Sequence, residues 1–105
     1  MVFALATDDG NLMVFASAAQ AEAYCEGVDV EDGVWSFFAE NGAPLSARFD
    51  RPNERGRFAV VSATYTLEPA AGPWLHDRLA EVRGVEGGGF GSIAEVKSHL
   101  AQRKE

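Results

Sequence analysis

The chain has 105 residues, enough for one domain with a buried core, and 47% of them are hydrophobic, which excludes a disordered chain. Its formal net charge of −7 disfavours nucleic acid as a partner, because the phosphates would be repelled. No segment approaches the roughly 20 apolar residues of a membrane span, and Met1 to Gly10 lacks the basic and apolar regions of a signal peptide. With a single cysteine, Cys25, no internal disulfide can form. We therefore expect a cytoplasmic protein with no membrane partner.

The charge is distributed unevenly along the chain. Residues 1–47 contain eight acids and no Lys or Arg, a net charge of −8, whereas residues 48–105 contain eight acids and nine bases, a net charge of +1. Five of the acids gather just before the middle of the chain, namely Glu22, Glu26, Asp29, Glu31 and Asp32. Such an asymmetry favours a basic partner, which would be steered to the acidic surface.

Aromatic and alternating apolar residues predict five strands. The expected strands are residues 2–6, 12–15, 34–39, 45–49 and 58–67. The turn sequences Asp9-Gly10 and Asn41-Gly42 join the first four strands into two hairpins. The last strand alternates most regularly, which predicts one covered face and one wetter face.

Three helices are predicted, each from an apolar stripe and a start signal. The expected helices are residues 18–25, 73–83 and 93–103. Ser17 with Gln20, and Ser92 with Glu95, have the spacing of capping boxes. Gly27 is expected to stop the first helix, and the glycine-rich residues 84–91 to form a flexible connection between the last two.

Together these elements predict a single α+β domain over residues 1–105. The order is β-β-α-β-β-β-α-α, and because hairpins dominate, we expect a mainly antiparallel sheet of about five strands. The helices are expected to pack on one face of that sheet.

A calcium site is the first chemical alternative for the acidic stretch. Asp29, Glu31 and Glu40 match the first, third and twelfth positions of an EF-hand loop. The fifth position, Gly33, offers no side-chain ligand, and the sixth, Val34, replaces the glycine that the sharp turn requires. We therefore predict no metal site, and a solvated acidic connection or a partner surface instead.

Catalytic and cofactor sites are not predicted. Cys25 could act with His76 or His99 as nucleophile and base, but the pattern places Cys25 on the buried side of its helix. One cysteine and two scattered histidines give no zinc spacing. The glycines of residues 87–91 lack the Lys-Ser/Thr of a phosphate loop, so Phe90 is expected to pack in the core.

The remaining candidates are basic and aromatic. The only basic cluster is Arg48, Arg51, Arg55 and Arg57. It is interpreted as a solvated loop or as an internal counterweight to the acids, since a nucleic-acid site would need support from the rest of the surface. Trp35 and Trp74 are expected in the core, unless Trp35 is exposed beside the acids as an interface anchor.

One family resemblance involves these residues. Phe15-x-Ser17, the run from Ala23 to Gly33 with its Glu-Gly-Val-Asp-Val-Glu-Asp-Gly core, and Gly42-x-Pro44-Leu45 together resemble small acidic immunity proteins of bacterial polymorphic toxin systems. The resemblance covers about residues 12–49. It implies a non-enzymatic inhibitor that binds a cognate toxin, itself basic, in the cytoplasm of the producing cell.

The partner surface expected from this resemblance and from the charge consists of Glu22, Glu26, Asp29, Glu31, Asp32 and Trp35. No catalytic residue, cofactor or metal is expected, and homo-oligomerisation stays open. The alternative function is a small regulatory or ligand-binding α+β domain that acts alone or as a homodimer. A large apolar pocket would favour that alternative.

Overall fold

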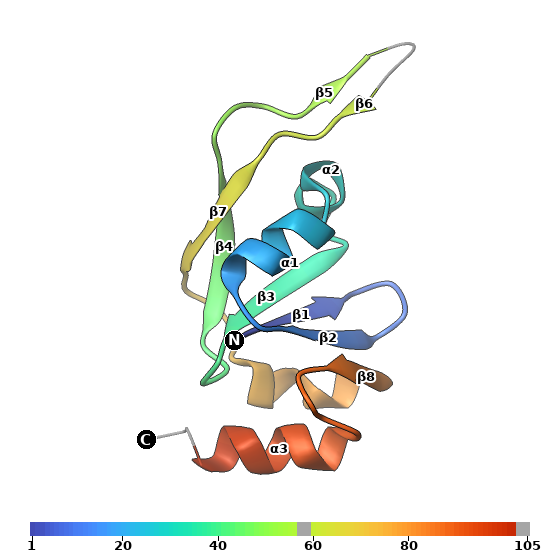
Figure 1. The fold of residues 1–105 in the computed structure, drawn as a ribbon, viewed down its shortest axis with the longest axis vertical. Coiled ribbons are helices and arrows are strands. Elements are labelled where there is room, and N and C mark those ends of the chain that lie inside the picture. The colour runs from blue at the N-terminus through green and yellow to red at the C-terminus, as the bar shows by residue number, and fades with distance from the viewer. Residues whose placement is uncertain (57–59, 103–105) are drawn as a thin grey trace.

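The computed structural model describes residues 1–56 and 60–102 (Figure 1). It is an α+β domain built on a mostly antiparallel sheet, which confirms the predicted fold class. The elements are β1 (Val2–Ala6), β2 (Asn11–Phe15), α1 (Ala18–Tyr24), α2 (Gly27–Glu31), β3 (Trp35–Ala39), β4 (Pro44–Phe49), β5 (Glu54–Arg55), β6 (Val60–Val61), β7 (Tyr65–Pro69), the 3-10 helix η1 (Leu75–Glu81), β8 (Gly84–Gly87) and α3 (Ile93–Gln102).

The main sheet has six strands in the order β7-β4-β3-β1-β2-β8, one more than expected. β1 lies near the centre and pairs along its length with β2 on one side and β3 on the other. All five residues of β1 are buried, because both faces of the sheet are covered there. Among the strand pairs of this sheet that the structure describes, only β2 and β8 run parallel.

The helices cover both faces of the sheet, so the prediction of one covered face was wrong. On one face, Phe3 and Leu5 pack against η1 and α3 in a core that includes Leu75 and Val96. On the other face, Ala4 and its neighbours pack against α1 through Ala21 and Cys25. Figure 1 shows α1 and α2 on one side of the strands and α3 on the other. The alternating apolar side chains of β1 make this possible, since successive residues point to opposite faces.

The first two hairpins and the first helix start form as predicted. Gly10 in the first turn has φ +75°, a conformation that glycine adopts without strain. The Ser17 hydroxyl accepts a hydrogen bond from the Gln20 N–H at 3.2 Å, and the Gln20 amide oxygen accepts from the Ala16 N–H. α1 therefore begins at its predicted capping box.

The prediction that Gly27 stops the first helix was wrong, because Gly27 instead begins α2. The first helix ends at Tyr24, three residues before Gly27. A β-carbon on Gly27 would stand 2.4 Å from the Ala63 carbonyl oxygen, closer than such atoms approach. The glycine is needed here for close packing, and the acidic stretch is a short helix where a solvated connection was expected.

The predicted single strand over residues 58–67 is divided, and Phe58 and Ala59 lie outside the described residues. β6 ends at Val61 and β7 begins at Tyr65. The alternation holds from Ala63 onward, since Ala63 and Tyr65 are buried while Thr64 and Thr66 are exposed, but Val61, expected on the covered face, is 42% exposed.

β4 and β7 continue into β5 and β6 as a long hairpin, which we call the arm (the described parts of residues 50–64). The arm stands away from the sheet in Figure 1 and gives the molecule its length of 46 Å, against 24 and 22 Å in the other directions. Part of this segment was expected to be a plain loop.

The C-terminal third differs most from expectation. The helix expected over residues 73–83 is the 3-10 helix η1, and the glycine-rich segment contains β8, where a flexible connection was expected. Phe90 packs partly buried against the core beside Phe3, as predicted. α3 begins after its predicted capping box, in which Glu95 N–H donates to Ser92 and Gly91 N–H donates to Glu95. The predicted end of this helix at Arg103 falls outside the described residues.

Candidate partner-binding surface

The predicted surface residues lie on α1, on α2 and at the start of β3. Glu26 is the N-cap of α2, Asp29 and Glu31 lie within the helix, and Asp32 is its C-cap. The helix turns one side to the protein, where Gly27 and Val28 are buried. Gly27 and Val28 take the buried positions, so the four acids Glu26, Asp29, Glu31 and Asp32 are gathered within two turns of backbone.

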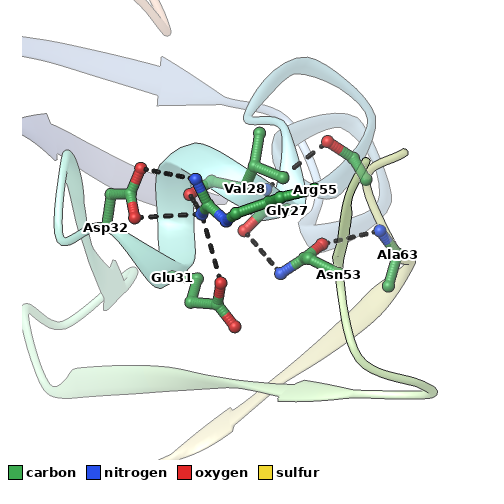
Figure 2. Close-up of polar contacts among 8 residues, drawn as sticks. Gly27, Val28, Glu31, Asp32, Asn53, Arg55 and Ala63 are labelled. Carbon is green, nitrogen blue, oxygen red and sulfur yellow. Dashed lines mark hydrogen bonds and ion pairs between the residues drawn. The ribbon is translucent and has the colours of Figure 1, made fainter. Parts of the chain in front are cut away.

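Two of the four acids are neutralised within the chain by Arg55 of the arm (Figure 2). The Arg55 Nη2 donates to Glu31 Oε1 at 3.1 Å and to Asp32 Oδ1 at 3.0 Å. It also donates to the Val28 carbonyl oxygen at 3.2 Å. The hydrogen bonds to Glu31 and Asp32 raise the pKa of the guanidinium above its usual value. The interpretation of the arginines as an internal counterweight is confirmed for Arg55.

Asn53 makes a second connection between the arm and α2 (Figure 2). Its Nδ2 donates to the Gly27 carbonyl oxygen at 3.2 Å, and its Oδ1 accepts from the N–H of buried Ala63 at 2.7 Å. The Ser62 hydroxyl accepts from the Val28 N–H at 3.4 Å, which satisfies an amide in the first turn of α2. The arm therefore holds α2 through neutral hydrogen bonds as well as through charge.

Glu22 has a structural role in addition to its predicted one. Its Oε2 accepts a hydrogen bond from the Leu67 N–H at 3.0 Å. Leu67 lies in β7, which is an edge strand of the main sheet. A covered edge amide lowers the risk of pairing with another chain. The Glu22 carboxylate thus joins α1 to the sheet.

Glu26 and Asp29 are the two predicted acids whose carboxylates make no hydrogen bond or ion pair within residues 1–56 and 60–102. Two aromatic residues flank them in the sequence, Tyr24 two residues before Glu26 and Trp35 at the start of β3. Tyr24 is 58% exposed, and its ring packs edge-on against the ring of half-buried Trp35, with 6.2 Å between the two ring centroids. We call these four residues, Tyr24, Glu26, Asp29 and Trp35, the acidic–aromatic surface.

Trp35 also lines a hollow between β3 and β4. The two strands pair only at Phe37 with Leu45 and at Phe38 with Pro44, and they diverge beyond these residues. The opening has a volume of about 330 Å³ and is lined by apolar and polar groups, including Phe49. Trp35 is therefore neither fully in the core nor a free anchor on the surface.

Two further arginines of the basic cluster, Arg48 and Arg51, are paired along the arm and its base. Arg48 contacts Glu68 at 3.1 Å, and Arg51 contacts Glu54 at 3.4 Å, both through exposed side chains. Arg57 lies outside the described residues. Exposed pairs of this kind contribute little to stability.

Cys25 is fully buried against β7. Burial, with a smaller effect from the charge of Asp29, raises the pKa of its thiol to about 12, so the thiol is protonated at neutral pH. The Tyr65 hydroxyl donates to the Cys25 carbonyl oxygen at 2.7 Å, and burial likewise raises the pKa of this phenol.

The two histidines lie across the sheet from Cys25. The His99 ring packs against Phe3 at 5.9 Å, and His76 follows Leu75, both residues of the opposite core. Neither imidazole can therefore reach the thiol as a base. In the part of the chain that the structure describes, no three His, Cys, Asp or Glu side chains form a group that could hold a metal ion.

Sequence reasoning did not find Asn53 or the exposure of Tyr24 and Trp74, which is 36% exposed. Asn53 lies in a segment of turn-forming residues, and such a composition does not show which long-range contact a side chain makes.

Across residues 1–56 and 60–102, no helix has both the length and the apolar character to cross a bilayer. Comparisons with protein-family models, with curated proteins and with solved structures found no match.

Proposed function

We propose that this chain is a non-enzymatic binding protein that neutralises a basic partner protein, as an immunity protein neutralises its cognate toxin in the bacterial cytoplasm. The observation that carries the proposal is the acidic–aromatic surface. Glu26 and Asp29 form no ion pair among the described residues, and Tyr24, two residues before Glu26, is 58% exposed.

The charge distribution of the chain also supports a basic partner protein. Residues 1–47 contain eight acids and no Lys or Arg, and in the described structure Arg55 pairs with Glu31 and Asp32 of this set. An acidic surface accelerates association with a basic protein, and aromatic side chains supply contact area at small entropic cost. A toxin that acts on nucleic acid would be basic, and carboxylates could then lie where phosphates bind.

The first experiment identifies the partner. The tagged chain is purified from the cells that naturally produce it, and the proteins that remain bound are identified by mass spectrometry. We expect a basic domain that stops growth when it is produced alone. A captured protein that is acidic, or that is harmless when produced alone, would contradict the proposal.

The second experiment tests the surface with that partner. Glu26→Gln with Asp29→Asn should slow association and flatten its dependence on salt, because steering depends on charge at the surface, where Glu26 is exposed and Asp29 half-buried. The control is Asp77→Asn with Glu86→Gln, which removes two exposed carboxylates from η1 and β8. Equal effects of the two double variants would show that net charge matters and that this surface does not.

The hollow between β3 and β4 favours a second candidate function, a small regulatory or ligand-binding domain. Its volume of about 330 Å³ is at the lower end of the range for small-molecule sites. Native mass spectrometry of the protein purified from its own cells tests this candidate. A stoichiometric extra mass that disappears in Phe37→Trp, which would fill the hollow, supports a ligand, and an unliganded mass speaks against it.

A further inference from the structure

The turns of the first two hairpins hold the two ends of η1. The Leu75 N–H at its start donates to the Gly42 carbonyl oxygen at 2.8 Å, and the Arg83 N–H just beyond its end donates to the Gly10 carbonyl oxygen, also at 2.8 Å. Both glycines are buried and have positive φ, +87° at Gly42 and +75° at Gly10. A β-carbon on Gly42 would stand 3.0 Å from Leu100 Cδ2. The turn at Gly42 is therefore fixed by the helical layer that it supports.

The same turn contains a chemically labile pair of residues. An asparagine that precedes glycine loses its side-chain amide more readily than other asparagines, because glycine has no side chain to hinder the approach of its nitrogen. Of the three asparagines in the chain, Asn41 is the one that a glycine follows, whereas Asn11 and Asn53 precede larger residues.

The reaction at such a pair has two steps. The Gly42 backbone nitrogen loses its proton and forms a bond to the Asn41 Cγ, the bond from Cγ to Nδ2 breaks, and ammonia leaves. Water then opens the resulting five-membered imide at one of its two carbonyls. The product is aspartate when the original main chain is restored, or isoaspartate when the main chain runs through the side-chain Cβ and Cγ.

We propose that Asn41 is a deamidation site which the folded chain keeps closed, and that its conversion to isoaspartate releases the start of η1 from the sheet. The Gly42 N–H donates to the Ala39 carbonyl oxygen at 2.8 Å, and this bond must break before the nitrogen can lose its proton. The Asn41 Oδ1 accepts from the Ala43 N–H at 3.0 Å, which holds the side chain toward Ala43. The fold thus restrains both reacting groups, although the Asn41 side chain is exposed to water.

The two products have different consequences for the fold. Aspartate leaves the main chain unchanged, and its carboxylate can still accept from the Ala43 N–H. Isoaspartate lengthens the main chain by one carbon directly before Gly42. The glycine can then no longer meet Ala39 with its N–H and Leu75 with its carbonyl oxygen at the same time. The Leu75 N–H, which belongs to a fully buried residue, loses its acceptor.

The test of the closed site follows deamidation of the full chain at pH 8 over a series of urea concentrations. Mass spectrometry of proteolytic peptides measures deamidation at each asparagine, and circular dichroism measures the unfolded fraction. We expect Asn41 to react before Asn11 and Asn53 in the unfolded chain. Without urea, its rate should be at least about tenfold lower, because a local opening that costs about 1.4 kcal/mol already reduces the reactive population tenfold.

The dependence on urea separates protection by the fold from an effect of the solvent. The rate at Asn41 should follow the unfolded fraction and be nearly constant on either side of the transition. A rate that does not change through the transition, or unfolded chains that deamidate at Asn11 or Asn53 as fast as at Asn41, would overturn the inference.

The consequence for η1 is tested on chains aged in urea, refolded and separated by chromatography into the aspartate and isoaspartate forms. The matched control is freshly purified Asn41→Asp, which has the same charge on an unchanged main chain. The isoaspartate form should melt below this control by roughly 4–12 °C, the shift expected when a buried amide loses its acceptor. Equal melting temperatures would overturn the release of η1. Neither measurement requires a partner protein, so the outcome is independent of the proposed function.

Discussion

Asn53 is the residue through which the attachment of the arm to α2 is most directly tested. In Asn53→Ala the N–H of Ala63, a residue only 3% exposed, loses its acceptor, and the Gly27 carbonyl loses a donor. An unsatisfied buried amide costs about 1–3 kcal/mol, and a neutral hydrogen bond contributes about 1 kcal/mol. We therefore expect a loss of about 2–4 kcal/mol in the free energy of unfolding.

The assay is thermal and urea unfolding followed by circular dichroism. For a domain of this length, 1 kcal/mol lowers Tm by roughly 4 °C, so the variant should melt roughly 8–16 °C below wild type. The control is Asn41→Ala, which removes an exposed bond to the Ala43 N–H two residues away in a turn. Asn41→Ala should lower the free energy of unfolding by less than about 1 kcal/mol, since water replaces the lost acceptor. Equal losses in the two variants would refute the argument that Asn53 connects two separate elements.

Three further predictions concern the core and the turns. Tyr65→Phe should cost about 1–2 kcal/mol in urea unfolding, because it leaves a buried carbonyl without its donor, whereas Tyr24→Phe on the exposed ring should cost almost nothing. The Cys25 thiol should react slowly with a disulfide reagent at pH 8 until the chain unfolds. Because its pKa rises from 9.0 to about 12 on folding, its contribution to stability is complete below pH 9 and is lost as the pH rises toward 12. Cys25→Ala should weaken this alkaline loss without abolishing it, since burial also raises the pKa of Tyr65. Gly10→Ala should lower Tm more than Gly33→Ala: both glycines have positive φ, but only at Gly10 would a new β-carbon meet a backbone oxygen, at 2.5 Å. Comparable losses within either variant pair, or a fast-reacting native thiol, would contradict these arguments.

Local signals predicted local structure well. The Ser17 and Ser92 capping boxes mark the starts of α1 and α3, and Asp9-Gly10 forms the first turn, because each signal acts through atoms within four residues. The alternation around Tyr65 also survives in the fold, since it follows from the two-residue period of a strand.

The errors arose where distant segments decide the outcome. Gly27 lies in α2 because the arm packs against it, and β8 forms because β2 offers a parallel edge. Gly27 has the local character of a helix stop, and residues 84–87 have that of a loop. The neighbouring residues in the sequence do not indicate the helix and the strand that form there. The two-sided packing of the sheet likewise depends on the crossing of the chain from β7 to η1.

For the candidate surface too, the sequence predicted the local properties and missed the contacts between distant segments. The sequence indicated the acids and the asymmetry of charge, which are properties of composition. It could not show that Arg55 forms ion pairs with Glu31 and Asp32, or that Glu22 accepts a hydrogen bond from Leu67 in the edge strand β7. The fold therefore reduces the predicted set of five acids to Glu26 and Asp29 as the carboxylates without a partner in the described part of the chain.

The most direct test of the proposed function is a titration of the captured partner's activity with this chain. For a non-enzymatic inhibitor of high affinity, the activity should fall linearly and reach zero at one molecule of chain per molecule of partner, and cells that produce both proteins should grow normally. Activity that is unchanged at a molar excess of the chain, or that falls only with time as in a catalysed inactivation, would contradict the proposal.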